Sequence, residues 1–204
     1  MSDFVASGDN SRNLAPWRSP LARALHRNRS RPYSRYFQLA TVQSNGRPAN
    51  RTVVFRGFWA EGNGLLFVTD QRSQKVNDLS HCSWAEACWY FTQTREQFRL
   101  AGAVTLICHN QPDPALQQAR QQSWESLSEP GRQSFYWPVP GQPRHSGEDF
   151  YPAPGSPAPT PPPTFCLGWL MPDTVDHLEL RGDPQNRTRY EVIEGQWQAI
   201  AVNP

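Results

Sequence analysis

Residues 51–75 read RTVVFRGFWAEGNGLLFVTDQRSQK and predict two strands, a turn between them and the start of a helix. Residues 51–56 are β-branched or aromatic between two arginines, which is typical of a half-buried strand. The turn residues at 61–64 precede a second apolar run at 65–69, so the two runs predict a hairpin. Ser73 is then a suitable N-cap for a helix over residues 74–79.

The same stretch predicts a phosphate site. A helix N-terminus offers unpaired backbone N–H groups and the positive end of the helix dipole, and Lys75 lies in its first turn. Arg51 would face this turn across the hairpin. Lys75 is also the only lysine, whereas the other basic residues in the total of 20 are arginines. This bias favours a compact ammonium group needed at one place, and the alternative is an ordinary surface lysine.

Four motifs, in this order, resemble those of the pyridoxamine 5′-phosphate oxidase-like FMN-binding split barrels. They read RTVVFRGF at 51–58, FVT at 67–69, SQKVNDL at 73–79 and EQFRLAG at 96–102. The resemblance implies a mainly β fold with a few helices (α+β). Its centre would be a six-stranded, Greek-key-like antiparallel barrel, the FMN-binding split β-barrel.

The resemblance also implies where FMN binds. Arg51 and Lys75 resemble phosphate ligands, and Thr69 and Ser73 would donate further hydrogen bonds to the phosphate. The other FMN-binding positions that it implies are Thr52, Val53, Val54, Arg56, Val68, Gln74, Gln97 and Arg189.

Within this set, residues 52–54 would run along the isoalloxazine ring and Gln97 would contact the flavin from the next strand pair. Arg189 resembles the late arginine that approaches the ring from the partner chain. A cation at that place would stabilise the reduced, anionic flavin. The implied assembly is therefore a homodimer with FMN at the interface.

Several positions depart from the oxidase pattern. Gln74 stands where many members have arginine, and Arg56 where the oxidase usually has lysine. Glu179 or Leu180 falls where the oxidase carries a tryptophan over the flavin. The oxidase motifs that hold the vitamin phosphate, R-P-R-x-S and R-x-H, are replaced by SEPGR at 128–132 and QNR at 185–187. The sequence therefore implies an oxidase-related sister family that keeps FMN, with an unassigned substrate.

Composition predicts one domain over residues 14–204, after a polar tail at 1–13 that we expect to be disordered. Ten of the 20 prolines fall between residues 138 and 163, which predicts a polyproline-like internal loop. The chain has neither a transmembrane-length apolar run nor a signal peptide, so we expect a cytoplasmic protein that does not bind membranes. The four cysteines lack C-x-x-C spacing, so we expect reduced thiols, with neither a zinc site nor a disulfide framework.

The rest of the chain predicts further strands and two helices. A helix capped by Ser19 would run to residue 28, and another would span 112–127. Strands are predicted at 36–42, 86–91, 97–107, 166–170, 175–181, 188–193 and 197–202. Counted along the chain with those at 51–56 and 65–69, the first five strands would form a meander with one helix inserted after the third. Seven arginines between residues 12 and 35 allow nucleic-acid binding, but a solvated helix face explains them better because the net charge is only +2.

The leading hypothesis for function is an FMN-dependent oxidoreductase whose substrate and electron donor are unassigned. The first alternative is a flavin-binding carrier or sensor without turnover. The second is a haem-binding split barrel, in which His81 or His109 would be the axial ligand. Asp176 and His177 are candidates for acid–base catalysis only through their expected position near the flavin, so no catalytic residue is assigned.

Overall fold

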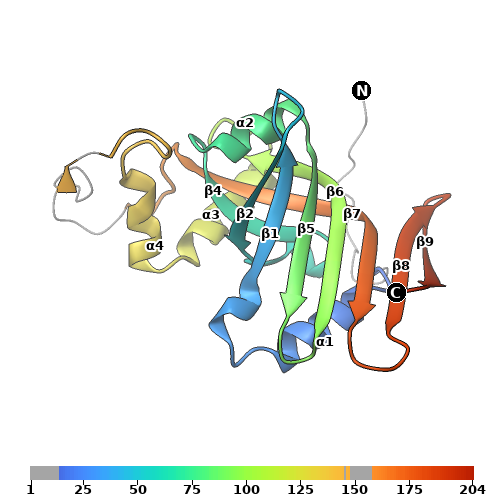
Figure 1. The fold of residues 1–204 in the computed structure, drawn as a ribbon. Helices are drawn as coiled ribbons and strands as arrows, with labels where there is room; N and C mark the ends of the chain where they lie inside the picture. The colour runs from blue at the N-terminus through green and yellow to red at the C-terminus, as the bar shows by residue number, and fades with distance from the viewer. Residues whose placement is uncertain (1–13, 145, 148–157) are drawn as a thin grey trace.

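The computed structural model of the chain describes residues 14–144, 146–147 and 158–204. The tail at 1–13 and part of the predicted proline-rich loop lie outside the described residues. Across the described part, nine strands form one antiparallel sheet with helices at its ends and one edge (Figure 1). The strands are β1 (Tyr36–Val42), β2 (Pro48–Val54), β3 (Gly57–Phe58), β4 (Leu65–Asp70), β5 (Trp84–Phe91), β6 (Glu96–Ile107), β7 (Phe165–Glu179), β8 (Asn186–Ile193) and β9 (Gln196–Val202).

The sheet follows the order β2-β1-β5-β6-β7-β4-β3, and β8 and β9 continue from β7. The first half of β7 pairs with β4, whereas its second half pairs with β8, so the sheet divides along this strand. The sheet curls until β2 and β4 approach one another. There the Arg56 N–H donates to the Leu66 carbonyl at 2.8 Å, and no β2–β4 ladder is present in the described part. This open seam confirms the predicted split barrel.

Two local predictions were wrong. The strand at 51–56 does not form a hairpin with the strand at 65–69, because β2 pairs with β1 and β4 pairs with the short β3 and with β7. Gly57 makes this possible with a φ of +125°, a conformation that favours glycine. The predicted meander is consequently interrupted at β4. β1 pairs with β2 and β5 pairs with β6, as a meander requires, but β4 lies far from β2 in the sheet order.

The core lies inside the curled sheet. The largest fully buried side chains there are aromatic, and they include Phe37, Phe67, Trp89 and Phe98. Helix α1 (Arg18–Arg27) covers the lower end of the barrel in Figure 1 with Leu21 and Ala24. Its N-cap position is Trp17 and not Ser19, so that predicted cap was wrong. Burial of this apolar surface is the main stabilising contribution to the fold.

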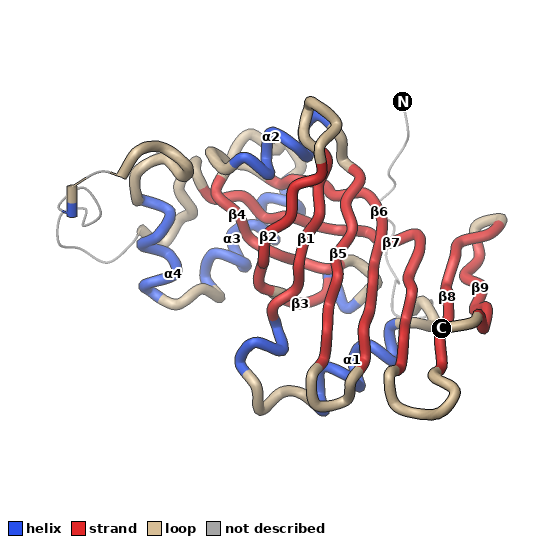
Figure 2. Tube along the Cα trace, viewed as in Figure 1, coloured by secondary structure: helices blue, strands red, loops and turns tan. Residues whose placement is uncertain are grey.

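The segment between β6 and β7 leaves the sheet and carries α3 (Pro114–Glu125), α4 (Glu129–Gln133) and the 3-10 turn η4 (Ser134–Tyr136), on the left in Figures 1 and 2. We call residues 109–164 the excursion. Its core is a separate cluster of Trp124, Leu127, Phe135 and Phe165, with Val68 of β4 packed against it. The excursion therefore packs directly on β4.

Cys108 and Cys166 form a disulfide at the base of the excursion, with their Cα atoms 4.6 Å apart. The expectation that all cysteines are reduced was wrong in this respect. The register of the sheet explains the pairing, since Ile107 of β6 lies opposite Leu167 of β7 and the next pair along the strands is Cys108 and Cys166. Cys82 and Cys88 are free. The described part of the chain contains no helix of the length and apolarity that a membrane span requires.

Candidate functional site

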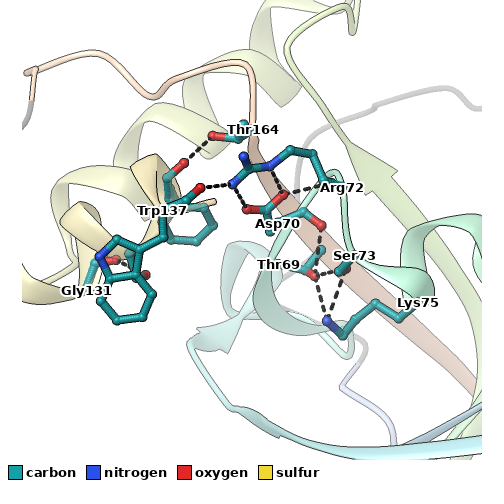
Figure 3. A network of polar contacts seen from close by, with 10 residues as sticks. Thr69, Asp70, Arg72, Ser73, Lys75, Gly131, Trp137 and Thr164 are labelled. Atoms are coloured by element: carbon teal, nitrogen blue, oxygen red, sulfur yellow. Dashed lines mark hydrogen bonds and ion pairs between the residues drawn. The ribbon is translucent and has the colours of Figure 1, made fainter. Parts of the chain in front are cut away.

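The predicted phosphate ligands meet at the junction of β4 and helix α2 (Gln74–His81). The Lys75 Nζ lies 3.0 Å from the Thr69 hydroxyl and 3.2 Å from the Ser73 hydroxyl, and the two hydroxyls are 3.1 Å apart (Figure 3). We call these three residues, together with Arg51, the anion cradle. The side chains converge as the motif spacing predicted.

The turn before α2 explains why the Ser73 side chain faces Lys75. Asp70 accepts hydrogen bonds from the Arg72 backbone N–H at 2.7 Å and from its guanidinium at 2.7 and 3.0 Å. The Ser73 N–H in turn donates to the Asp70 carbonyl at 3.0 Å. Ser73 occupies the N-cap position of α2, but its side chain makes no capping bond. Its hydroxyl is therefore available to the cradle.

Arg51 extends toward the cradle from β2 and forms an ion pair with the buried Asp78 of α2. Its Nη2 lies 3.1 Å from Asp78 Oδ2, and its Nη1 donates to the Thr41 hydroxyl at 2.6 Å. Thr41 donates to the same Asp78 oxygen at 2.8 Å. The Asp78 side chain is completely buried, whereas that of Arg51 is 22% exposed. Arg51 thus spans from the interior to the surface.

Burial and neighbouring charges shift the pKa values of Asp78 and Lys75. Burial alone would raise the pKa of Asp78, but hydrogen bonds from Gln74, Thr41 and Arg51 lower it below its usual value. Burial lowers the pKa of Lys75, and the nearby Arg51 charge lowers it further. Two cations and two hydroxyls at a helix N-terminus are suited to bind a phosphate dianion.

A second polar site lies on the outer face of the sheet. It is a pocket of about 250 Å³, which we call the outer pocket, and it is lined by Glu86, Arg99, Ala101, Thr174, Asp176, Arg187 and Arg189. Ion pairs join Arg99 to Glu86 at 2.6 Å and Arg187 to Asp176 at 2.6 Å. Arg189 pairs with Glu191. The predicted flavin-proximal arginine therefore lies in a charged pocket.

The two sites lie at opposite parts of the same sheet. Strand pairing places six residues in a row across the outer face, namely Thr52, Gln38, Cys88, Arg99, Asp176 and Arg189. Thr52 and Arg189 are five strand spacings apart, or about 24 Å along the sheet. Arg189 therefore does not meet the β2 residues of its own chain.

The other predicted FMN-binding residues lie at several different positions on the barrel. The Val53 side chain points into the core with 7% exposure. Gln97 lies on β6, the strand that also carries Arg99 and Ala101 of the outer pocket. Val68 packs against the excursion core. Arg56 follows β2 at the barrel seam. Binding of FMN by these positions stays a prediction.

Two residues of the site were missed from the sequence. Thr41 and Asp78 hold Arg51, and Gln74 donates to Asp78 Oδ1 at 3.0 Å. Binding of FMN by Gln74 stays a prediction. Asp78 was visible in the SQKVNDL motif at i+4 from Gln74. The pairing of β1 with β2 agrees with the first step of the predicted meander, but the contact of Thr41 with Asp78 depends on the packing of α2 against β1, which no local signal gives.

The histidine candidates lie elsewhere. His177 is buried inside the barrel, where its Nε2 is 2.9 Å from Glu96 Oε2 and its ring stacks on Phe98. This is a structural position away from the outer pocket, whereas its neighbour Asp176 lines that pocket. His81 and His109 are both exposed, at the end of α2 and after β6. Neither lies in the pocket or the cradle.

Comparisons with known proteins indicate the family of the chain. A family model described as pyridoxamine 5′-phosphate oxidase, FMN-binding domain, matches residues 14–108. A curated relative from Arabidopsis thaliana, pyridoxine/pyridoxamine 5′-phosphate oxidase 2, is 40% identical over 195 residues, which cover 94% of this chain and 98% of the relative.

Solved structures extend the likeness to three dimensions. A pyridoxamine 5′-phosphate oxidase-related, FMN-binding protein from Nostoc punctiforme is 53% identical with a TM-score of 0.90, over 94% of this chain and all of that one. PhzG from Burkholderia lata, solved with tetrahydrophenazine-1-carboxylic acid, is 20% identical with a TM-score of 0.77 over the whole of both chains. The second likeness concerns the fold alone.

Proposed function

The chain belongs to the pyridoxamine 5′-phosphate oxidase-related family of FMN-binding split barrels, and from this premise we propose that it is an FMN-dependent oxidoreductase. When bound, FMN would accept two electrons from a reduced substrate and pass them to an acceptor. The protein would bind the cofactor, orient it and tune its charge.

The observation that carries this proposal is the anion cradle. The Lys75 amine is directed at two hydroxyls at a helix N-terminus, and Arg51 is fixed beside it. A terminal phosphate matches this donor set, since charged donors and hydroxyls bind phosphate oxygens strongly. The cradle therefore fits FMN and offers nothing comparable to riboflavin, which lacks the phosphate.

Purification followed by anaerobic reduction tests the proposal. We expect a yellow protein that releases FMN, whose flavin absorbance bleaches with NADPH or NADH and returns when air is admitted. A bound flavin that none of the screened reductants bleaches would instead support the carrier or sensor alternative. Release of a chromophore other than FMN would overturn the proposed cofactor site.

We propose that pyridoxamine and pyridoxine 5′-phosphates are poor substrates. The name of the Arabidopsis relative favours these compounds, but residues 128–132 and 185–187 lack the arginine and histidine motifs that would hold the vitamin phosphate. Losing several charge-assisted contacts removes at least a few kcal/mol of binding. A kcat/KM of about 10⁴ M⁻¹s⁻¹ or more for either compound, an ordinary enzyme efficiency, would contradict this.

We also propose that the working site is shared between two chains. A two-fold partner that covers the outer face would bring each chain's β2, which carries Thr52 on that face next to Arg51, to the other chain's Arg189. The same face exposes three aromatic side chains, with Tyr36 44%, Trp84 55% and Tyr90 43% exposed. Apolar groups gathered in this way favour a protein interface.

A further inference from the structure

Asp78 carries a negative charge directly beneath the anion cradle. Its carboxylate is fully buried and accepts hydrogen bonds from three separate elements, through Thr41 of β1, Arg51 of β2 and Gln74 of α2. Gln74 takes one carboxylate oxygen, which leaves the other to Arg51 and Thr41. All of these distances lie between 2.8 and 3.1 Å.

The charge of Asp78 opposes the binding of an anion. A carboxylate near a phosphate dianion repels it, and the repulsion is larger where burial reduces the screening by water. If net charge alone decided phosphate affinity, the cradle would be better without Asp78. Asp78 must therefore favour phosphate binding through an effect other than its charge.

That effect is the orientation of Arg51. The guanidinium is planar and its five N–H groups form a rigid fork, so fixing two nitrogens fixes the direction of the remaining donors. Asp78 holds Nη2, while Thr41, itself bonded to Asp78, holds Nη1 at 2.6 Å. The flexible arginine side chain is thus ordered before any ligand arrives, which reduces the entropy lost on binding.

We propose that Asp78 is a positioning residue for the cofactor phosphate, acting through Arg51, and that this gain in orientation exceeds the repulsion from its charge. The inference rests on the proposed FMN site and goes beyond it by separating position from charge. The two effects predict opposite outcomes for one substitution, which makes them distinguishable.

The test is Asp78→Asn, which keeps the size of the side chain and removes its charge. We expect the Kd of FMN, measured by quenching of flavin fluorescence on the full-length apo-protein, to rise by about ten- to a hundredfold, the range for a lost hydrogen bond to a charged group. The Kd of riboflavin should change less than about twofold, since riboflavin carries no phosphate for Arg51 to bind.

A matched control is Asp113→Asn. Asp113 caps helix α3 by accepting from the Ala115 N–H at 2.8 Å, and asparagine caps equally well. The control removes the same charge elsewhere, so FMN affinity should stay unchanged. Thr41→Val is a second, isosteric variant that removes only the hydroxyl between Arg51 and Asp78. It should weaken FMN in the same selective way and decides the question if Asp78→Asn does not fold.

A double-mutant cycle then shows whether Asp78 acts through Arg51. In an Arg51→Ala background, Asp78→Asn should no longer weaken FMN, because the group that it positions is gone. A purely structural role of Asp78 would give the same loss in both backgrounds, and that result would overturn the inference.

Other outcomes would also overturn it. FMN that binds equally or more tightly to Asp78→Asn would show that charge, and not position, decides affinity. An equal loss of FMN and riboflavin would show damage to the whole site. If the wild-type protein does not prefer FMN to riboflavin, the proposed phosphate site fails and this inference fails with it, so the two failures are distinguishable.

Discussion

Lys75 is the residue at which stability and binding oppose one another. Burial and the adjacent Arg51 charge both lower its pKa, so the protonated amine is less favourable in the folded apo-protein than in water. A phosphate bound between these two cations would instead favour the protonated amine of Lys75. Residues that serve a binding site often destabilise the protein in this way.

We therefore predict that Lys75→Met raises the melting temperature of the apo-protein by a few degrees, as about 1 kcal/mol does for a domain of this size, while it weakens FMN by about 1.5–3 kcal/mol. Methionine keeps the length of the side chain and removes the charge. Thermal unfolding of the apo-protein and flavin titration measure the two effects. Arg47→Met, at an exposed turn, is the control, and a lower melting temperature for Lys75→Met would contradict the prediction.

The pH dependence of stability follows from the same shift. The folded-state pKa of Lys75 lies below its ordinary value of 10.5, so the unfolded state binds more protons between the two values. The free energy of unfolding of the apo-protein should therefore rise with pH in that window. The difference between wild type and Lys75→Met isolates this contribution, and a difference that does not vary with pH there would contradict it.

At this scale the sequence predicted much of the site. The four cradle residues lie within 25 consecutive positions, and the structure brings them together. Asp78 and Thr41 were missed because their contact arises from the packing of α2 against β1, which the local sequence does not give. Gln74 stands where many members have arginine, and its amide supports Asp78.

Among the elements, β7 shows most clearly where local patterns stop being informative. Separate strands were predicted at 166–170 and 175–181, but β7 runs unbroken from Phe165 to Glu179. A register shift in β6 between Ala101 and Gly102 accommodates Pro172 opposite Gly102. Proline in a sheet is tolerated at such bulges. The pairing partner, not the local sequence, decides the outcome.

Gly102 is the element-scale test of this bulge. A Cβ on Gly102 would lie 2.0 Å from the Met171 carbonyl oxygen, so the two backbones would have to separate. We predict that Gly102→Ala lowers the free energy of unfolding by about 3 kcal/mol or more, as overpacking against a rigid backbone does. Gly147→Ala, with nothing within 4 Å of the added carbon, is the control. Chemical denaturation measures both, and equal stabilities would contradict the close approach.

The disulfide at the base of the excursion makes a second prediction for the elements. Cys108 and Cys166 close a loop with a sequence separation of 58. Changing Cys108 to Ser should lower the free energy of unfolding by about 2–4 kcal/mol, since the unfolded chain regains freedom. In denaturant, a thiol reagent should react with two thiols, those of Cys82 and Cys88, before the disulfide is reduced. After the disulfide is reduced, it should react with four. Four reactive thiols before reduction would show that the bond does not form.

For the whole molecule, the class of fold was predicted correctly from the motifs, whereas the strand order was not. The motifs indicate which family of barrels the chain adopts, but the hairpin expected between residues 51–56 and 65–69 requires knowledge of which strand lies beside which. That information is non-local: β4 finds its partner in β7, about a hundred residues later.

The separation of the cradle from Arg189 leads to the prediction for the assembly. We expect a homodimer with two FMN, in which Arg189→Ala weakens FMN without dissociating the dimer. When this variant is mixed with Lys75→Ala, each heterodimer should regain one good site, because the intact cradle of one chain meets the intact Arg189 of the other. Flavin titration of the mixture, with sedimentation for the assembly state, measures this.

The control for this experiment is each variant alone, which should contain only defective sites. Mixing that restores no binding would contradict the shared site, as would an FMN-loaded monomer in sedimentation. Flavin affinity that falls on dilution, as dimers dissociate, would support it independently.

The separation of the cradle from Arg189 predicts how a mutant chain would affect the wild-type chain when both are present in one cell. If every site needs a cradle from one chain and an arginine from the other, a chain lacking both Lys75 and Arg189 spoils both sites of any dimer that it enters. Co-expressed in equal amounts with the wild type, and pairing at random, it would leave only about a quarter of the dimers competent. Such an allele would be dominant-negative, although it encodes a chain that still folds and assembles.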